Sequence, residues 1–431
     1  MKSLRKLGGL LAAGSLALSL ALSQTSCGGR YDGPAYAAAD TNAPAEWSAI
    51  AVKAVLDASA VTPGGMSPME ESRAYAMAFT AAHDALNAID RRYKPYLSDL
   101  HAPGANADAA VASAVSTVLK TALPSQAAAL NTAYAAALTK LPDGDAKTAG
   151  VTLGQQTALA ILAARASDGS ANAQGPYAPA QAPGAYQFTP PFDFAAFVNW
   201  GAVTPFAMAS GNQFRTAAPF ALTDPGYTAD FNEVKSLGEA GSATRTADQT
   251  QIARFWLENT PMSWQRVAVK LATERRLNGW DQMRLYALLQ MAEADAYVAS
   301  FDSKYFYSFW RPITAIRAAA TDGNPDTTAD AAWTSLEPAP PIPDHASGHA
   351  AAAGAGAAVL DSVFTGPVAF THQSATLSGV TRSFVSIGQA EQEIGASRIY
   401  LGFHFRRAVS QGLKQGRQVG NWAVQHVMSP V

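Results

Sequence analysis

The stretch from residue 68 to residue 92 reads PMEESRAYAMAFTAAHDALNAIDRR, and its apolar pattern predicts the fold class. Tyr75, Phe79, Leu86 and Tyr93 follow one another at spacings that put them on one face of a helix with a period of 3.6 residues. Similar patterns, mostly rich in alanine, the strongest helix former, recur at residues 46–58, 105–122, 125–140, 145–167, 228–237, 244–258, 262–276, 279–317, 347–362, 381–396 and 405–428.

Strand-like stretches are short, at residues 367–371 and 399–403, and neither alternates over a useful length. The sequence therefore predicts an all-α helical-bundle protein, built as two packed helix bundles with negligible strand. The long pattern at 279–317 should break near Arg311-Pro312, because proline disfavours the helical conformation of the residue before it.

The chain has 431 residues, a formal net charge of −2 and one cysteine. Its charge gives no reason to expect a nucleic-acid partner, and a single cysteine allows no internal disulfide. We expect one all-α domain over residues 44–431, with the bundle that carries the motifs described below at about 244–431, and a flexible Gly-, Ala- and Pro-rich lead at 27–43.

The first 26 residues have the layout of a secretory signal. A basic start at Lys2, Arg5 and Lys6 precedes an apolar run of small residues that is short for a membrane-spanning helix. Cys27 follows, so the segment is read either as a lipoprotein signal with a lipid anchor at Cys27 or as an ordinary signal that is cleaved nearby. The predicted localisation is export, as a periplasmic protein, a membrane-anchored lipoprotein or a secreted protein.

The segment at 168–204 contains five prolines and several aromatic residues, including Tyr186 and Trp200. We expect a long loop that packs on the body of the protein near a functional site, since long loops in compact proteins are usually functional or disordered.

Three segments of the C-terminal third carry residues suited to binding an oxyanion. In KYFYSFWRP (304–312), Lys304 and Arg311 are seven residues apart on one helix face, and the aromatic residues between them suggest a buried segment whose cations need an anionic partner. In IPDHASGH (342–349), Ser347 and Gly348 open a helix, whose free N–H groups attract anions, although Ser347 could also be a simple N-cap.

In the third segment, RIYLGFH (398–404), Arg398 offers a guanidinium that can bind an oxyanion through two hydrogen bonds, and His404 follows six residues later. A histidine in an apolar stretch is more often a core residue than a catalyst. It is the combination of the three segments that indicates a pocket for a tetrahedral oxyanion.

The order Lys-x6-Arg-Pro, Ser-Gly-His and Ser-Arg-x5-His resembles the signature of the type 2 phosphatidic acid phosphatase superfamily, and the chain is most similar within it to the vanadium-dependent haloperoxidases. FWRP (309–312), RIYLGFH (398–404) and the upstream stretch ALNAIDRRYKPY (85–96) extend the likeness to the soluble bacterial branch.

This resemblance implies roles for individual residues. His404 would bind the vanadium of vanadate, and His349 would be the acid/base group. The equatorial oxygens would be held by Lys304, Arg311, Ser347, Gly348 and Arg398. Vanadate is the implied cofactor, with phosphate able to occupy the same site, and a homodimer is implied as well.

Three positions depart from the family pattern. Ala346 stands before Ser347, where the family usually has proline. Ala408 stands where the signature usually has an aspartate, four residues after its last histidine, so the group that orients His404 is left unknown. Ile342 stands where the family has a halide-selecting residue. We place Ile342 and His345 in a candidate halide pocket, with surface capping as the alternative reading for Asp344 and His345.

The predicted function is vanadate-dependent oxidation of halide by hydrogen peroxide to hypohalous acid. One alternative is an acid phosphatase that cleaves a phosphomonoester through a phosphohistidine at His404. The other is a non-catalytic, phosphate-binding surface lipoprotein, a reading that Ala408 supports.

Overall fold

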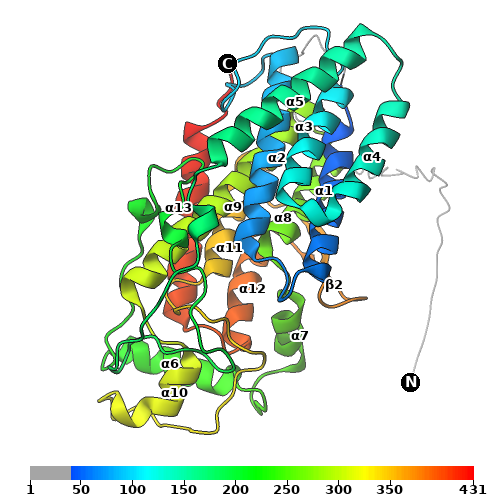
Figure 1. Ribbon diagram of the computed structural model, residues 1–431. Helices are drawn as coiled ribbons and strands as arrows, with labels where there is room; N and C mark the ends of the chain where they lie inside the picture. Colours follow the sequence, from blue (N-terminus) through cyan, green and yellow to red (C-terminus); the bar gives the residue numbers. More distant parts are fainter. Residues whose placement is uncertain (1–39) are drawn as a thin grey trace, which may run out of the picture.

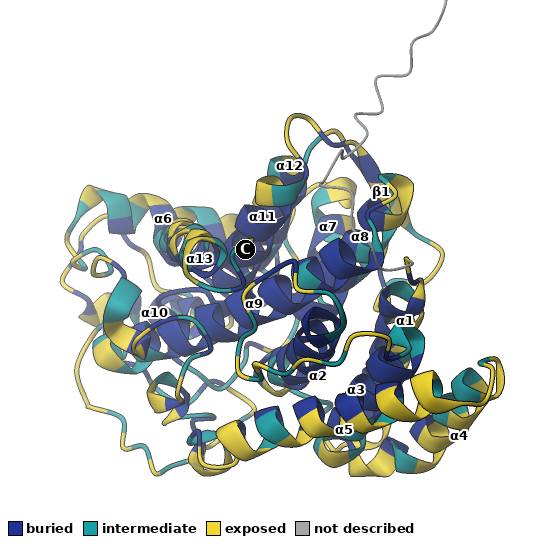
Figure 2. Cartoon of the chain, turned by 90° about the horizontal axis from the view of Figure 1, so that it is seen from above, coloured by how far each residue is buried: buried dark blue, intermediate teal, exposed yellow. Residues whose placement is uncertain are grey.

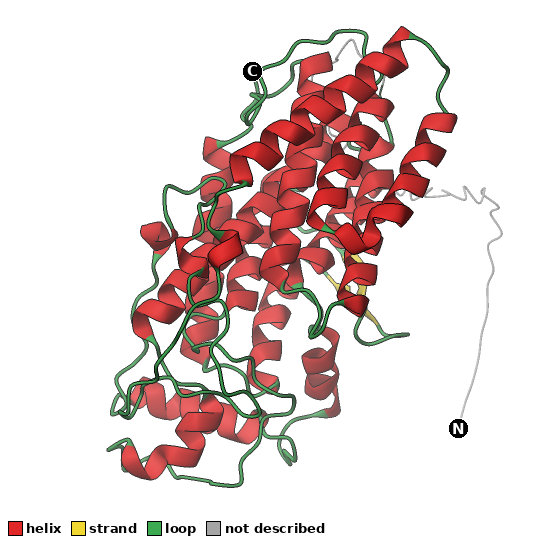
Figure 3. Cartoon of the chain, in the orientation of Figure 1, coloured by secondary structure: helices red, strands yellow, loops and turns green. Residues whose placement is uncertain are grey.

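The computed structural model describes residues 40–431, and within them the chain is almost entirely helical (Figures 1 and 3). In the first half the helices are α1 (Ala43–Val61), α2 (Pro68–Ile89), α3 (Ala107–Ala122), α4 (Ala127–Thr139), α5 (Asp145–Arg165) and α6 (Pro225–Leu237). The second half contains α7 (Ala247–Phe255), α8 (Thr260–Glu274), α9 (Gly279–Tyr307), α10 (Pro312–Ala318), α11 (Gly348–Val363), α12 (Ile387–Tyr400) and α13 (Arg406–His426). The predicted all-α fold is confirmed.

Helix α9 is the centre of the molecule. It packs against α2 on one side and against α11 and α13 on the other, while α3 and α5 pack on α2 and α12 packs on α11. Figure 2 shows α9 buried between these two groups of helices. The two bundles therefore share one long helix, and α9 is buried along nearly its whole length.

The long helix ends earlier than the sequence predicts. Ser308 adopts a left-handed conformation with φ of 45° and terminates α9, three residues before the break expected near Arg311-Pro312. Arg311 is instead the N-cap of α10, with extended backbone, as expected for a residue that precedes proline. The intervening turn moves Lys304 and Arg311 from one helix onto two.

The region before α12 also differs from the prediction. Residues 381–384 form a strand rather than the start of a helix, and β2 (Thr381–Phe384) pairs antiparallel with β1 (Phe370–Gln373). Ser386 then caps α12 by accepting a hydrogen bond from the N–H of Gln389. The strand-like stretch at 399–403 forms no strand, because its first residues complete the last turn of α12.

Close contact between α13 and α11 depends on glycine. A Cβ atom on Gly416 would lie 1.8 Å from the carbonyl oxygen of Ala351, and one on Gly412 would lie 2.6 Å from that of Ser347. Side chains at these positions would push the two helices apart. These glycines therefore let the last helix pack closely on α11.

The aromatic loop at 168–204 packs on the body, as expected. Tyr186 is fully buried, and its N–H donates to the carbonyl of Ser308 at the end of α9. Figure 3 shows that long loops gather at the end of the molecule that holds α6 and α10.

The proposed signal segment, Cys27 and most of the lead lie outside the described residues. None of the helices within residues 40–431 combines the length and apolarity needed to cross a membrane.

Candidate oxyanion site

A cavity of about 470 Å³ lies where the ends of α9, α11 and α12 meet the loop before α11 and the loop before α13. Six of the seven predicted oxyanion-site residues line it: Lys304, Arg311, Gly348, His349, Arg398 and His404. These side chains come from positions up to 100 residues apart in sequence (304 to 404), and the fold brings them to one cavity.

Lys304 and Arg311 are both fully buried and are held by backbone carbonyl groups. The ammonium group of Lys304 donates to the carbonyl oxygens of Pro343 at 2.7 Å and Asp344 at 3.0 Å. Arg311 donates from Nε to Ile342 at 2.7 Å and from Nη1 to Phe403 at 2.8 Å. Its Nη2 is buried without a partner in the described structure, which leaves strong N–H donors for an anion in the cavity.

The aromatic residues between these two cations are less buried than the sequence suggests. Phe306 is 60% exposed and lies 3.7 Å from the guanidinium of Arg215. The reasoning from a buried aromatic segment was therefore wrong for Phe306, although both cations are buried.

Arg398 approaches the cavity from the last turn of α12. Its Nε donates to the hydroxyl of Ser397 at 2.9 Å, and its Nη2 donates to the carbonyl of Trp256. Burial lowers the pKa of Arg398 to about 9. Burial also lowers the pKa of Lys304 well below its usual value, and the neighbouring charge of Arg311 lowers it further. Burial thus disfavours the charged form of both groups, and an anion in the cavity would stabilise it.

A carboxylate that orients His404 is present, although Ala408 cannot provide it. Asp344 is fully buried, and its Oδ1 lies 2.8 Å from Nδ1 of His404. The alternative reading of Asp344 as a surface cap is wrong. The sequence could not show this partner, because it precedes the histidine by 60 residues.

The contacts of His404 fix its protonation. Asp344 Oδ1 lies 2.8 Å from Nδ1 of His404, and an ionised carboxylate can only accept, so the proton of the neutral ring lies on Nδ1. Arg311 Nη1 lies close to both ring nitrogens, at 3.0 Å from Nε2 and 3.4 Å from Nδ1. Burial holds the pKa of His404 well below its usual value, and the charges of Arg311, Lys304 and Arg398 add to the effect. His404 is therefore neutral, and Nε2 carries the lone pair.

Asp344 is not an ordinary carboxylate. Burial raises its pKa to about 7, while Arg311 and Lys304 act in the opposite direction. Its Oδ2 has no hydrogen-bond partner among the described residues. Glu337 also lines the cavity and lies 3.7 Å from Arg254.

His349 lies in the first turn of α11, where its Nε2 is 3.2 Å from the carbonyl oxygen of Glu258. A carbonyl only accepts, so Nε2 carries the proton and Nδ1 is free to act as a base. Burial lowers the pKa of His349 to about 3, and Arg398 lowers it as well. An anion beside Arg398 would raise that pKa towards the range of an acid/base group.

Ser347 is the predicted residue that does not line the cavity. It is the N-cap of α11, and its hydroxyl accepts a hydrogen bond from the N–H of Ala350 at 3.4 Å. The structure thus supports the capping role for Ser347, whereas Gly348 borders the cavity directly.

The two candidate halide-pocket residues are separated. Ile342 lines the cavity. His345 is buried elsewhere, with Nε2 at 3.1 Å from the hydroxyl of Thr216 and 2.8 Å from the carbonyl of Ala217. The geometry keeps Ile342 in the candidate halide pocket and gives His345 no place in it.

Sequence reasoning missed several lining residues, among them Asn259, Tyr297 and Phe301. Tyr297 lies two turns before Lys304 on α9, so the helix period could have revealed it. Asn259 carries no such signal, because it comes from a helix start far away in sequence. Ala196 and Phe197 of the aromatic loop also reach the cavity.

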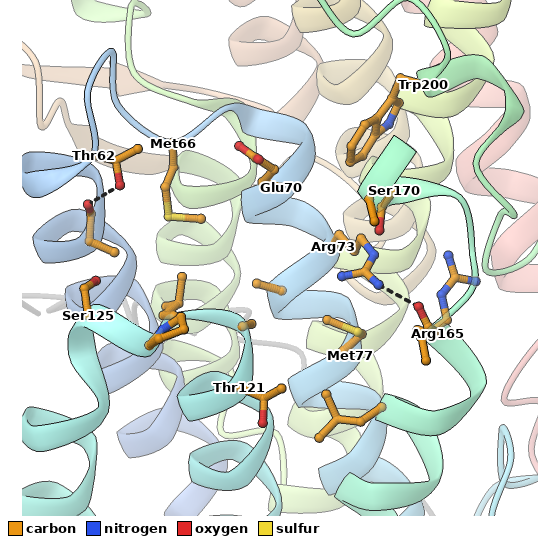
Figure 4. A pocket seen from close by; sticks show the side chains of 18 residues that line it. Thr62, Met66, Glu70, Arg73, Met77, Thr121, Ser125, Arg165, Ser170 and Trp200 are labelled. Carbon is orange, nitrogen blue, oxygen red and sulfur yellow. Dashed lines mark hydrogen bonds between the residues drawn. The ribbon is translucent and has the colours of Figure 1, made fainter. Parts of the chain in front are cut away.

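A second, larger cavity of about 580 Å³ lies between α2, α5 and the turn after α3 (Figure 4). Its two arginines are already paired, because Asp168 accepts from Arg73 at 2.7 Å and from Arg165 at 3.0 Å. Alanine and methionine side chains make up much of the rest of its wall. It has no set of unpaired cations, so the smaller cavity is the better candidate for oxyanion chemistry.

Comparison with known proteins points in the same direction. The sequence model of a family described as the VCPO second helical-bundle domain matches residues 284–431. Vanadium chloroperoxidase of Curvularia inaequalis is 30% identical over an alignment that covers 35% of this chain and 31% of that protein. The matched part thus spans less than a third of this relative.

Solved structures match over more of the chain. A bacterial vanadium-dependent iodoperoxidase has a TM-score of 0.77 and 25% identity, and the match covers 89% of this chain and 97% of that one. A bacterial vanadium-dependent chloroperoxidase has a TM-score of 0.68 and 18% identity, with 83% and 92% covered. The second likeness shows the shared fold alone.

Proposed function

We propose that this chain, which belongs to the vanadium-dependent haloperoxidase family, holds vanadate in the oxyanion cavity and oxidises halide with hydrogen peroxide. The observation that carries the proposal is the unpartnered, fully buried Nη2 of Arg311, in a cavity that Lys304 and Arg398 also line. Buried N–H donors of a cation are costly without an acceptor.

The residues present fit vanadate by their chemistry. His404 offers a neutral Nε2 lone pair for vanadium, and Asp344 fixes the ring through Nδ1. Lys304, Arg311 and Arg398 offer donors for the negatively charged oxygens, together with the backbone of Gly348 at the start of α11. When bound, vanadate supplies an electron-poor centre that activates hydrogen peroxide towards a halide.

The chain's own residues handle the proton. Halide oxidation takes up one proton, since hydrogen peroxide, halide and a proton give hypohalous acid and water. His349 borders the cavity with Nδ1 free, so it is the group that we assign to accept and return a proton there. Ile342, Phe301 and Phe403 line the cavity with apolar surface that excludes water around the halide.

One observation keeps the phosphatase alternative in view. A nucleophilic histidine needs a carboxylate that orients it, and Asp344 supplies one at His404. Ala408 in place of the usual aspartate therefore does not argue against phosphatase turnover. The same finding weakens the case for a non-catalytic phosphate-binding protein, which also rested on Ala408.

The test compares activities of one purified protein. We expect halide- and peroxide-dependent bromination of a phenolic dye that requires added vanadate and is lost in His349→Ala and His404→Ala. His426→Ala is the matched control, because His426 is exposed at the end of α13 and distant in sequence from the cavity residues. Turnover of an aryl phosphate without vanadate, and no bromination with it, would establish the phosphatase instead.

A further inference from the structure

A group of buried polar side chains without partners lies between α2 and α9, next to the oxyanion cavity. The unpartnered atoms are Oε1 of Glu71, the hydroxyl of Tyr75, both carboxyl oxygens of Glu293 and the hydroxyl of Tyr297. Glu71 and Tyr75 are one turn apart on α2, and Glu293 and Tyr297 are one turn apart on α9, which packs against α2. Unpaired polar groups rarely occur in such number in a protein interior, so the group calls for a function.

Two residues connect this group with the cavity. Asn259 lines the cavity, and its amide donates to Oε2 of Glu71 at 2.8 Å. Tyr297 also lines the cavity, one helical turn from Glu293. A single residue of the cavity wall therefore connects each carboxyl group with the cavity: Asn259 for Glu71 on α2, and Tyr297 for Glu293 on α9.

The charged groups nearby do not neutralise the two carboxyl groups. On α8, Arg266 forms its ion pair with Glu258 at 2.7 Å, and its charge lowers the pKa of Glu71 by less than burial raises it. Neither Glu71 nor Glu293 forms an ion pair in the described structure. Arg398 of α12 interacts electrostatically with Tyr297. An isolated buried carboxylate is very costly, so these groups take up protons instead.

The pKa values follow this expectation. Burial raises the pKa of Glu71 to about 8, against the lowering effect of the Asn259 hydrogen bond, and Glu258 raises it further. Burial raises the pKa of Glu293 well above its usual value, and Glu71 adds to the effect. Both shifts favour the protonated form of the carboxyl group, whereas ordinary glutamates are ionised near neutral pH.

We propose that Glu71 and Glu293 form a proton-holding carboxyl pair that exchanges protons with the oxyanion cavity through Tyr297. The hydroxyls of this group lack direct partners, so bridging water molecules between them are part of the proposal. The pair releases one proton towards the cavity, Tyr297 passes a proton on as it receives one, and the pair is reprotonated from solvent.

The role of this carboxyl pair as a proton source for turnover rests on the proposed function, in which each turnover consumes one proton in the cavity. His349 is the residue that delivers it there, and the pair restores the proton of His349. Glu71, Glu293 and Tyr297 thus act through His349 rather than on the substrates.

Infrared spectroscopy of the vanadate-free protein tests the pair without any activity. At about pH 6, where an ordinary glutamate with a pKa of ~4.3 is ionised, we expect a carbonyl band of protonated carboxyl groups that weakens in Glu71→Gln and in Glu293→Gln. The band should shift on transfer to heavy water, and Tyr297→Phe should slow that shift. Tyr286→Phe is the matched control, a buried phenol on the same helix that does not line the cavity.

Kinetics test the connection to turnover. We expect Tyr297→Phe to lower kcat by about tenfold at alkaline pH, less than the ~10²–10⁴-fold contribution of a group that touches the reacting atoms. The effect should shrink towards acid pH, the KM for halide and the Kd for phosphate should change less than twofold, and Tyr286→Phe should behave as wild type.

Each outcome decides one statement. An infrared band that is unchanged in both glutamine variants overturns the pair. A heavy-water shift or a pH profile of kcat that is the same in Tyr297→Phe and wild type overturns the relay. Absence of vanadate-dependent halide oxidation in the wild type contradicts the proposed function, while the infrared measurements still decide whether the pair holds protons and exchanges them through Tyr297.

Discussion

Two substitutions of Asp344 separate its hydrogen bond from its charge. Asp344→Ala and Asp344→Asn both remove a negative charge from the neighbourhood of the cations, but only alanine also removes the acceptor that lies 2.8 Å from Nδ1 of His404. We expect the alanine variant to bind vanadate about ten- to a hundredfold more weakly than the asparagine variant.

The magnitude follows from the contacts. Loss of the group that orients a metal-binding histidine typically costs ~10–100-fold in affinity, whereas loss of an average hydrogen bond costs ~1 kcal/mol, or about fivefold. Removing a charge at a distance of ~7 Å strengthens anion binding by about 2 kcal/mol at an effective dielectric constant of ~20. These opposing effects are similar in size, so comparing wild type with alanine alone would not isolate the hydrogen bond.

Isothermal titration calorimetry with vanadate, repeated with phosphate, measures both variants directly. Circular dichroism checks that each variant keeps its helical content. Equal affinities of the alanine and asparagine variants would show that Asp344 does not position His404, and the reasoning from the 2.8 Å contact would be refuted.

Three further predictions concern stability and binding. Gly416→Ala should lower the unfolding free energy by at least ~1–3 kcal/mol, because its Cβ would lie 1.8 Å from the carbonyl oxygen of Ala351. Gly388→Ala is the control and should leave the unfolding free energy unchanged, because no atom lies nearer than 4.0 Å to its Cβ. Urea titrations measure both. The raised pKa of Glu71, about 8 against 4.5 for the ordinary group, contributes stability below pH 4.5 that is lost as the pH rises through 8. The unfolding free energy should fall by up to ~1.4 kcal/mol per pH unit in that window, and Glu71→Gln should flatten the profile. Vanadate at about 100 times its Kd should raise the unfolding free energy of the wild type by ~2.7 kcal/mol. Thermal unfolding should show this as a higher Tm, and the rise should vanish in Lys304→Ala.

The part of the site that could be predicted consists of residues whose chemistry is unusual for their position. Lys304, Arg311 and Arg398 were identifiable because buried cations and an ordered set of motifs are rare. Asp344 could be seen in sequence as a polar residue next to a motif, but its role depends on a loop that folds back onto His404. Such a long-range contact leaves no local pattern.

Local reasoning failed where tertiary packing or a single backbone angle decides the structure. Ser308 ends α9 with a left-handed conformation that a serine rarely adopts, so no propensity indicates it. Residues 381–384 pair with β1 and become a strand, although their composition does not exclude a helix. The carboxyl pair of Glu71 and Glu293 was missed because α2 and α9 are about 200 residues apart in sequence, and only their packing brings the two groups together.

The sharing of α9 between the two bundles sets a limit on how the protein can be divided. A fragment that starts at residue 284, where the family match begins, starts inside α9 and lacks α2, which covers one side of that helix. The exposed apolar side would favour self-association of the fragment. We therefore expect the fragment 284–431 to elute as aggregates in size-exclusion chromatography, and a monomeric, folded fragment would show that the C-terminal bundle is independent after all.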